Sequence, residues 1–196
     1  MLRRRLDRHG RMALATAWPC AEGLNSVPLV FASRHGDLDR TLELLSALAQ
    51  AEAISPTAFS LSVHNSTAGL FSIARSDRAA ATAVAAGADT LSMGFMEAAN
   101  MIAEGLSAVL YCYADDLPPP TYRPYLAEES ARHPFSISLL LTQAGDAAQS
   151  YRLARHADAP AEAPETALVR FLVEGTALGM LGVDQPWRIE RQSYAH

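Results

Sequence analysis

The stretch from Ser55 to Gly105 decides the fold, and it reads SPTAFSLSVHNSTAGLFSIARSDRAAATAVAAGADTLSMGFMEAANMIAEG. Its pattern predicts an extended segment that leads into a helix at Asn65, then a strand of small residues from Ala79 to Ala86, then a long helix from Asp89. In an α/β sheet, a nucleophile or an anion lies at such a strand-to-helix corner, because free N–H groups and the helix dipole converge there. The corner here has neither a thiol nor a hydroxyl group at its centre.

The rest of the chain alternates between helical and strand patterns, which is typical of a layered α/β fold. Short apolar runs such as VPLVFA indicate strands that are covered on both faces. Proline-rich loops separate the elements but do not divide the chain, because each flank is too small to bury a core alone. The further predicted helices are Arg3–Ala17, Leu38–Ala51 with Asp37 as N-cap, and Glu165–Glu174; the further predicted strands are Val27–Ala32, Ala108–Ala114, Phe135–Leu141 and Trp187–Glu190.

The composition favours a single compact domain over residues 1–196 and excludes several functional classes. Apolar residues make up 49% of the chain and charged residues 19%, which are ordinary values for a globular protein. No apolar run approaches the ~18 residues of a membrane span, and the basic start lacks the apolar region of a secretory signal. The net charge of −5 argues against general nucleic-acid binding. Two cysteines, Cys20 and Cys112, suggest reduced thiols and a cytoplasmic protein.

Three motifs of the opening stretch resemble the N-terminal half of the β-ketoacyl synthases, the condensing enzymes of fatty-acid and polyketide assembly. They are Ser55-Pro56, the N-x-x-A-G pattern from Asn65 to Gly69, and Arg78 before the small-residue strand. The clearest match covers residues 27–114, and Arg3 to Thr16 is more loosely similar to an early helix of the family. This resemblance implies a single α/β domain with the N-terminal half of the thiolase-like fold.

The resemblance also places the family's catalytic cysteine on a residue that cannot replace it. An ungapped pairing puts the cysteine on Ala88, and a gapped alternative puts it on Val84. The family's second half carries two catalytic histidines in H-G-T-G-T and N-x-F-G-F-G motifs, and neither motif occurs here. The resemblance therefore implies no catalytic residue, no metal and no cofactor. In the family, the segment around Asn65 lies at the dimer interface near the substrate tunnel, which gives as interface or tunnel candidates Ser62, His64, Asn65, Ala68, Gly69 and Phe71.

Other residue patterns suggest chemistry only weakly. The string Tyr113-Ala114-Asp115-Asp116 resembles a polymerase metal motif, but two acidic residues after a strand are more often turn residues. Ser62 and His64 lie close together without the G-x-S-x-G elbow of a hydrolase. Asp115, Asp116, His64 and His35 remain the candidates for an enzyme of different chemistry on the same half-fold.

We expect the chain to be a non-catalytic, chain-length-factor-like subunit. By resemblance, its partner would be a full-length β-ketoacyl synthase in aryl-polyene, other polyketide or fatty-acid-type biosynthesis. The chain would close the wall of the substrate tunnel, which is a packing role that needs no nucleophile. A homodimer that serves as a scaffold is the alternative. A basic cluster at the N-terminus could dock an acyl carrier protein or another partner, although such a charge run is more often a solvated helix face; it comprises Arg3, Arg4, Arg5, Arg8 and Arg11.

Overall fold

The computed structural model describes residues 5–125, 133–144, 150–158 and 162–192. A four-stranded sheet forms its centre, with the strand order β2-β1-β3-β4. The strands are β1 (Leu29–Ala32), β2 (Ala81–Val84), β3 (Ala108–Asp115) and β4 (Phe135–Thr142). The first three run parallel, and β4 pairs with β3 in the antiparallel sense. The small-residue strand β2 therefore lies at one edge of the sheet.

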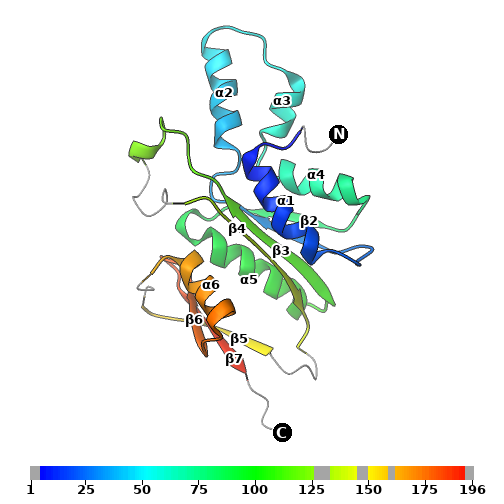
Figure 1. The fold of residues 1–196 in the computed structure, drawn as a ribbon, viewed down its shortest axis with the longest axis vertical. Coiled ribbons are helices and arrows are strands. Elements are labelled where there is room, and N and C mark those ends of the chain that lie inside the picture. Colours follow the sequence, from blue (N-terminus) through cyan, green and yellow to red (C-terminus); the bar gives the residue numbers. More distant parts are fainter. Residues whose placement is uncertain (1–4, 126–132, 145–149, 159–161, 193–196) are drawn as a thin grey trace.

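Helices cover both faces of this sheet (Figure 1). The helices α1 (Arg8–Cys20) and α4 (Ser66–Arg75) pack on one face, and α5 (Thr90–Ala103) packs on the other. Successive side chains of a strand point to opposite faces, so β1 and β3 supply both apolar layers. Toward α1 and α4 lie Leu29, Phe31, Leu110, Cys112 and Ala114; toward α5 lie Val30, Ala32, Val109, Tyr111 and Tyr113.

The contact between α5 and the sheet depends on a glycine. A Cβ atom at Gly94 would lie 2.6 Å from the Cβ of Ala32 and 3.0 Å from Cε2 of Tyr111. The Tyr111 hydroxyl donates to the Leu91 carbonyl oxygen at 2.7 Å, which satisfies the polar end of this buried ring. The helix can lie this close to β1 only because residue 94 has no side chain.

A second, smaller sheet follows toward the C-terminus. Its strands β5 (Ser150–Arg155), β6 (Leu178–Leu181) and β7 (Trp187–Gln192) have the order β5-β7-β6 and are antiparallel. The helix α6 (Pro164–Glu174) packs on this sheet and beside α5. Apolar residues of α6, β6 and β7 continue the layer beneath α5, so the two sheets share one core.

Two helices project away from the central sheet as a hairpin (Figure 1). They are α2 (Leu38–Ala49) and α3 (Pro56–Leu61), and neither contains a buried residue. The Asp37 carboxylate caps α2 by accepting from the Arg40 backbone N–H at 2.9 Å, as the sequence predicts. The described residues also form two short 3₁₀ turns, Gly87–Asp89 and Arg123–Tyr125. Among the described residues, no helix is long and apolar enough to cross a membrane.

The structure confirms the α/β fold and most predicted elements, but it corrects one prediction. The segment before Asn65 is not extended. Pro56 stands in the first turn of α3, and the Ser55 hydroxyl caps that helix by accepting from the Ala58 N–H. Asn65 does occupy the N-cap position of α4, yet its side chain makes no capping hydrogen bond. The strands β5 and β6 were not predicted from the sequence. Residues 3 and 4 of the predicted N-terminal helix lie outside the described residues.

Two glycine-to-alanine variants should have opposite effects on the free energy of unfolding. Gly94→Ala should lower it by about 1–3 kcal/mol, because the new methyl group overlaps Ala32 and Tyr111. Gly69→Ala should raise it by about 0.5–1 kcal/mol, because that helical glycine has nothing within 4 Å of an added Cβ. Urea denaturation of the purified chain measures both changes. Equal effects of the two variants would contradict the close packing of α5 on β1.

Candidate functional site

The corner between β2 and α5 holds no nucleophile. Ala88 lies at its centre, half-buried, and offers only a methyl group. The nearby hydroxyl of Thr90 is engaged within the turn, where it donates to the Gly87 carbonyl oxygen at 2.8 Å and accepts from the Ala86 N–H at 2.9 Å. Val84, the other position considered for the missing cysteine, lies in β2 and packs against the α5 side of the core.

Asp89, which follows Ala88 in the chain, has a structural role that was not predicted from the sequence. Its buried carboxylate accepts three backbone N–H groups from the turn between β6 and β7: Val183 at 2.6 Å, Asp184 at 3.1 Å and Gln185 at 3.1 Å. Three such donors compensate for the lost hydration of a buried anion. The second sheet is thereby attached at the start of α5. The one sequence signal for this role is that an aspartate stands at the start of a long apolar helix.

A cluster of buried polar groups lies where β1 and β3 end, which we call the β1/β3 polar cluster. At its centre, the Ser33 hydroxyl donates to Asp115 at 2.9 Å and accepts from the Gly36 N–H at 2.9 Å. Nε2 of His9 lies 3.1 Å from this hydroxyl and 2.9 Å from the Ala114 carbonyl oxygen. Tyr113 completes the cluster, since its hydroxyl lies 2.7 Å from Asp115 and 3.0 Å from Glu165.

The two aspartates of the weakly predicted metal motif, Asp115 and Asp116, both bind protein groups. Asp115 also accepts the Arg34 backbone N–H at 2.8 Å, so each of its oxygens has a protein donor. Asp116 forms an ion pair with Arg8 at 3.2 Å. Within the described residues, no three histidine, cysteine, aspartate or glutamate side chains are arranged to hold a metal ion. Both aspartates thus fasten the end of β3 to its surroundings.

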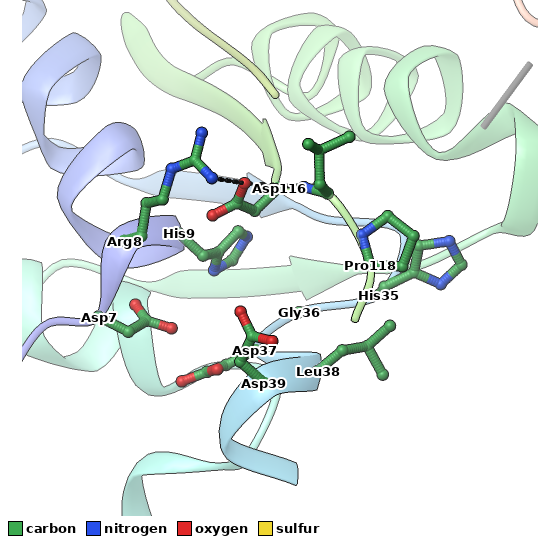
Figure 2. Close-up of a pocket in the computed structure, with 11 residues that line it drawn as sticks. Asp7, Arg8, His9, His35, Gly36, Asp37, Leu38, Asp39, Asp116 and Pro118 are labelled. Atoms are coloured by element: carbon green, nitrogen blue, oxygen red, sulfur yellow. Dashed lines mark hydrogen bonds and ion pairs between the residues drawn. The ribbon is translucent and has the colours of Figure 1, made fainter. Parts of the chain in front are cut away.

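A cavity of about 30 Å³ lies beside this cluster, between the starts of α1 and α2 (Figure 2). That volume is enough for about two water molecules. Nδ1 of His9 and Nε2 of His35 are buried in this region without a hydrogen-bond partner among the described atoms. Burial lowers the pKa of His35 despite the nearby charge of Asp115, which favours the neutral imidazole. The lining residues are Asp7, Arg8, His9, His35, Gly36, Asp37, Leu38, Asp39, Asp116, Leu117 and Pro118.

Two carboxyl groups of this cavity, Asp7 and Asp37, hydrogen-bond to each other. Burial and the hydrogen bond with Asp37 raise the pKa of Asp7 to about 6. Burial alone would also raise the pKa of Asp37, but hydrogen bonds from Asp7 and from Arg40 lower it. Below about pH 6 the pair therefore holds one proton, on Asp7.

The six predicted interface residues divide into exposed and buried sets. Ala68 and Phe71 are buried between α4 and the sheet, where Phe71 also packs edge-on against Trp18. They support the segment from within and offer no surface. Asn65 and Gly69 are exposed, and Ser62 and His64 are half-buried in the turn between α3 and α4.

Ser62 and His64 do not act on one another in this turn. The Ser62 hydroxyl donates to the Phe59 carbonyl oxygen at 2.8 Å, and Nε2 of His64 lies 2.7 Å from the Ser33 carbonyl oxygen. The histidine thereby ties the turn to the end of β1. Because Ser62 ends a helix, the expected arrangement of both residues along an extended strand is wrong.

The two cysteines are protected thiols. Cys112 is buried in β3, and burial raises its pKa to about 11. Cys20 is half-buried, burial raises its pKa as well, and its thiol donates to the Ser138 carbonyl oxygen. Neither is the thiolate that a nucleophile requires.

A family model described as "Beta-ketoacyl synthase, N-terminal domain" matches residues 1–177. The chain belongs to this family. The matched residues include the whole central sheet and the corner between β2 and α5. No curated protein matches the chain.

Two solved structures resemble the chain over most of its length. A structure described as a ketosynthase (ApeO) in complex with its chain length factor (ApeC), from Xenorhabdus doucetiae, has a TM-score of 0.83 and 28% sequence identity. The match covers 96% of this chain and 79% of that one. The ishigamide ketosynthase/chain length factor has a TM-score of 0.63 and 16% identity over 86% of this chain and 55% of that one. At 16% identity the second structure shows the shared fold alone.

The shared proton predicts how stability depends on pH. Because the pKa of Asp7 is raised on folding, its contribution is fully present below about pH 4 and is lost as the pH rises through about 6. Asp7→Asn replaces the proton with a permanent amide donor and keeps an oxygen for the Gly10 N–H. The variant should be more stable than the wild type by about 1–3 kcal/mol at pH 7.5 and by much less at pH 4.5. Thermal melts across this range measure the difference, and a gain that is independent of pH would contradict the shared proton.

Proposed function

We propose that the chain is a non-catalytic subunit that pairs with a full-length β-ketoacyl synthase and limits the length of its acyl product. The observation that carries this proposal is the α2–α3 hairpin. Its helices contain no buried residue, although they and the turn that follows carry large apolar side chains. The most exposed are Leu45 at 50%, Leu48 at 61%, Phe59 at 62% and Val63 at 46%. An apolar surface of this kind marks a protein interface.

The edge strand β2 supports pairing as well. It consists of Ala81, Thr82, Ala83 and Val84, and among the described strands it pairs with β1 alone. Alanine-rich strands have low intrinsic β-propensity, so pairing must hold such a strand in place. An unpaired edge of small residues also allows a close approach by a second chain. We propose that β2 faces the partner subunit, in the manner of its family.

The corner at Ala88 supports a role without catalysis. Condensation needs a thiolate, and this corner offers a methyl group, a tied hydroxyl and a carboxylate held by three N–H groups. A subunit that only closes a tunnel needs none of these groups. Its contribution is the bulk of the side chains at the closed end.

The likeness to the ketosynthase–chain length factor complex supports the same proposal. At 28% identity over 96% of this chain, the resemblance concerns sequence as well as fold. We therefore propose aryl-polyene or related polyketide biosynthesis as the setting, with fatty-acid-type synthesis as the alternative. The cytoplasm is the proposed location.

An acyl carrier protein is a further proposed partner, and the described arginines of the N-terminal cluster remain exposed. Of the N-terminal cluster, Arg8 is paired with Asp116, and Arg11 donates to the Leu6 carbonyl oxygen at 2.8 Å. Arg5 is exposed, and Arg3 and Arg4 lie outside the described residues. We expect a carrier protein to contact mainly the catalytic partner.

The proposal predicts the effect of a charge on the hairpin. Leu48→Glu should weaken the complex with a co-expressed full-length synthase by about a hundredfold, because it removes apolar burial and places a carboxylate in the interface. Val173→Glu is the matched control, since Val173 is 77% exposed on α6, at the opposite end of the molecule (Figure 1). Tag pull-down followed by size-exclusion chromatography measures both. A one-to-one complex that tolerates Leu48→Glu would refute the hairpin as the interface, and a homodimer without the synthase would favour the scaffold alternative.

A substitution at Gly69 tests the predicted interface segment. Gly69→Leu meets open space in the isolated chain, so the variant should fold with a melting temperature no lower than that of the wild type. If α4 faces the synthase, the added side chain should block assembly in the same pull-down. Normal assembly of this variant would remove α4 from the proposed interface.

A further inference from the structure

Two helices of this molecule meet N-terminus to N-terminus through their capping residues. Asp7 caps α1, with its Oδ1 2.7 Å from the Gly10 N–H, and Asp37 caps α2 in the same way through Arg40. Figure 2 shows the Asp7 carboxyl group turned toward Asp37 across the cavity. The hydrogen bond between these two side chains links the first helix of the domain to the base of the hairpin.

The charges around the pair leave Asp7 as its protonated member. On α2, the Arg40 guanidinium binds Asp37 at 2.7 Å, and Asp39 adds a carboxylate to the cavity wall. On α1, Arg8 binds Asp116, which comes from the end of β3. The other titratable groups of the lining are the imidazoles of His9 on α1 and His35 on the turn after β1. Arg8 and Arg40 thus form their ion pairs with Asp116 and Asp37, and among the described residues neither is paired with Asp7.

The α2 end of the hairpin is held to the domain mainly by polar contacts. Neither α2 nor α3 contains a buried residue, and the apolar contact of the hairpin with the core is made by the partly buried Leu61 at the end of α3. The contacts at its base are the Gly36 N–H to Ser33 hydroxyl bond, the bond between His64 and the Ser33 carbonyl, and the Asp7–Asp37 pair. Gly36, with a φ of +61°, provides a turn at this point. Of these contacts, the carboxyl pair requires a proton to be attractive.

We infer that the Asp7–Asp37 pair is a proton-dependent latch that fixes the α2–α3 hairpin against α1. With the proton in place, one carboxyl donates to the other and the base of the hairpin is closed. Without it, two like charges face each other at close range, and the base loosens. The raised pKa of Asp7 puts the change near pH 6.

One consequence rests on the proposed function. If the synthase binds the closed hairpin, assembly takes up a proton, and the complex should be tighter at pH 5.5 than at pH 7.5. The latch itself is a property of the isolated chain. A measurement without the synthase therefore tests it independently of the proposed function.

Backbone amide hydrogen exchange of the purified chain is the test. At pD 7.5, Asp7→Asn should slow exchange in α2 and α3 by about tenfold relative to the wild type, because its amide donates permanently to Asp37. Exchange in β3 should not change by the same factor. Asp39→Asn is the matched control, since it removes one carboxylate from the same cavity outside the pair, and it should leave hairpin exchange at the wild-type rate. At pD 5.5, after correction for the intrinsic rate, the wild type should approach Asp7→Asn.

Three results would overturn the latch. The first is hairpin exchange that is equal in the wild type and Asp7→Asn at both values of pD. The second is slowing that appears equally in Asp39→Asn, because this would indicate a general effect of charge. The third is slowing that is uniform over hairpin and sheet, because this would reflect global stability alone. If Asp7→Asn does not fold, Asp37→Asn supplies the permanent donor from the other side of the pair, with the same expected protection of α3.

Discussion

The side chain and backbone of Ser33 hold together parts of the chain that are far apart in sequence. The residue is fully buried at the end of β1, and its hydroxyl is shared among His9 of α1, Asp115 of β3 and Gly36 at the base of the hairpin. Its carbonyl oxygen receives His64, and its N–H donates to Val84 of β2. A buried hydroxyl that found no partners would cost about 1–3 kcal/mol, so these segments must arrive together. The cavity, the carboxyl pair and the hairpin all take their positions from this point.

The regular elements could be predicted because their signals are local. The apolar runs of β1 and β3 and the helical spacing of α5 are visible within a few residues, and Asp37 precedes its helix as an N-cap should. The helix α3 was missed because only six residues form it, and short helices carry little periodicity. The strands β5 and β6 were missed for a similar reason. Each is half-exposed and paired at one edge, so neither shows a continuous apolar pattern.

The candidate sites were less predictable, because their contacts join distant residues. The family resemblance located the corner at Ala88, but nothing in the local sequence indicated that Asp89 receives the turn between β6 and β7. The meeting of Asp7 with Asp37 likewise depends on how α1 and α2 converge at the ends of the strands. Asn65 does stand at the start of α4 as predicted, although its side chain makes no capping hydrogen bond.

The three N–H groups that surround Asp89 have a consequence for the order of folding. The contact with Val183 joins residues 94 positions apart, so it forms only when a long loop is closed. The Asp89 carboxylate therefore relies on water for its hydrogen bonds until the C-terminal strands have formed. During synthesis, residues 183–185 emerge from the ribosome long after the central sheet, so the nascent chain waits with this aspartate in water. The turn between β6 and β7, which is synthesised late, thus supplies the hydrogen bonds for Asp89 at the start of α5.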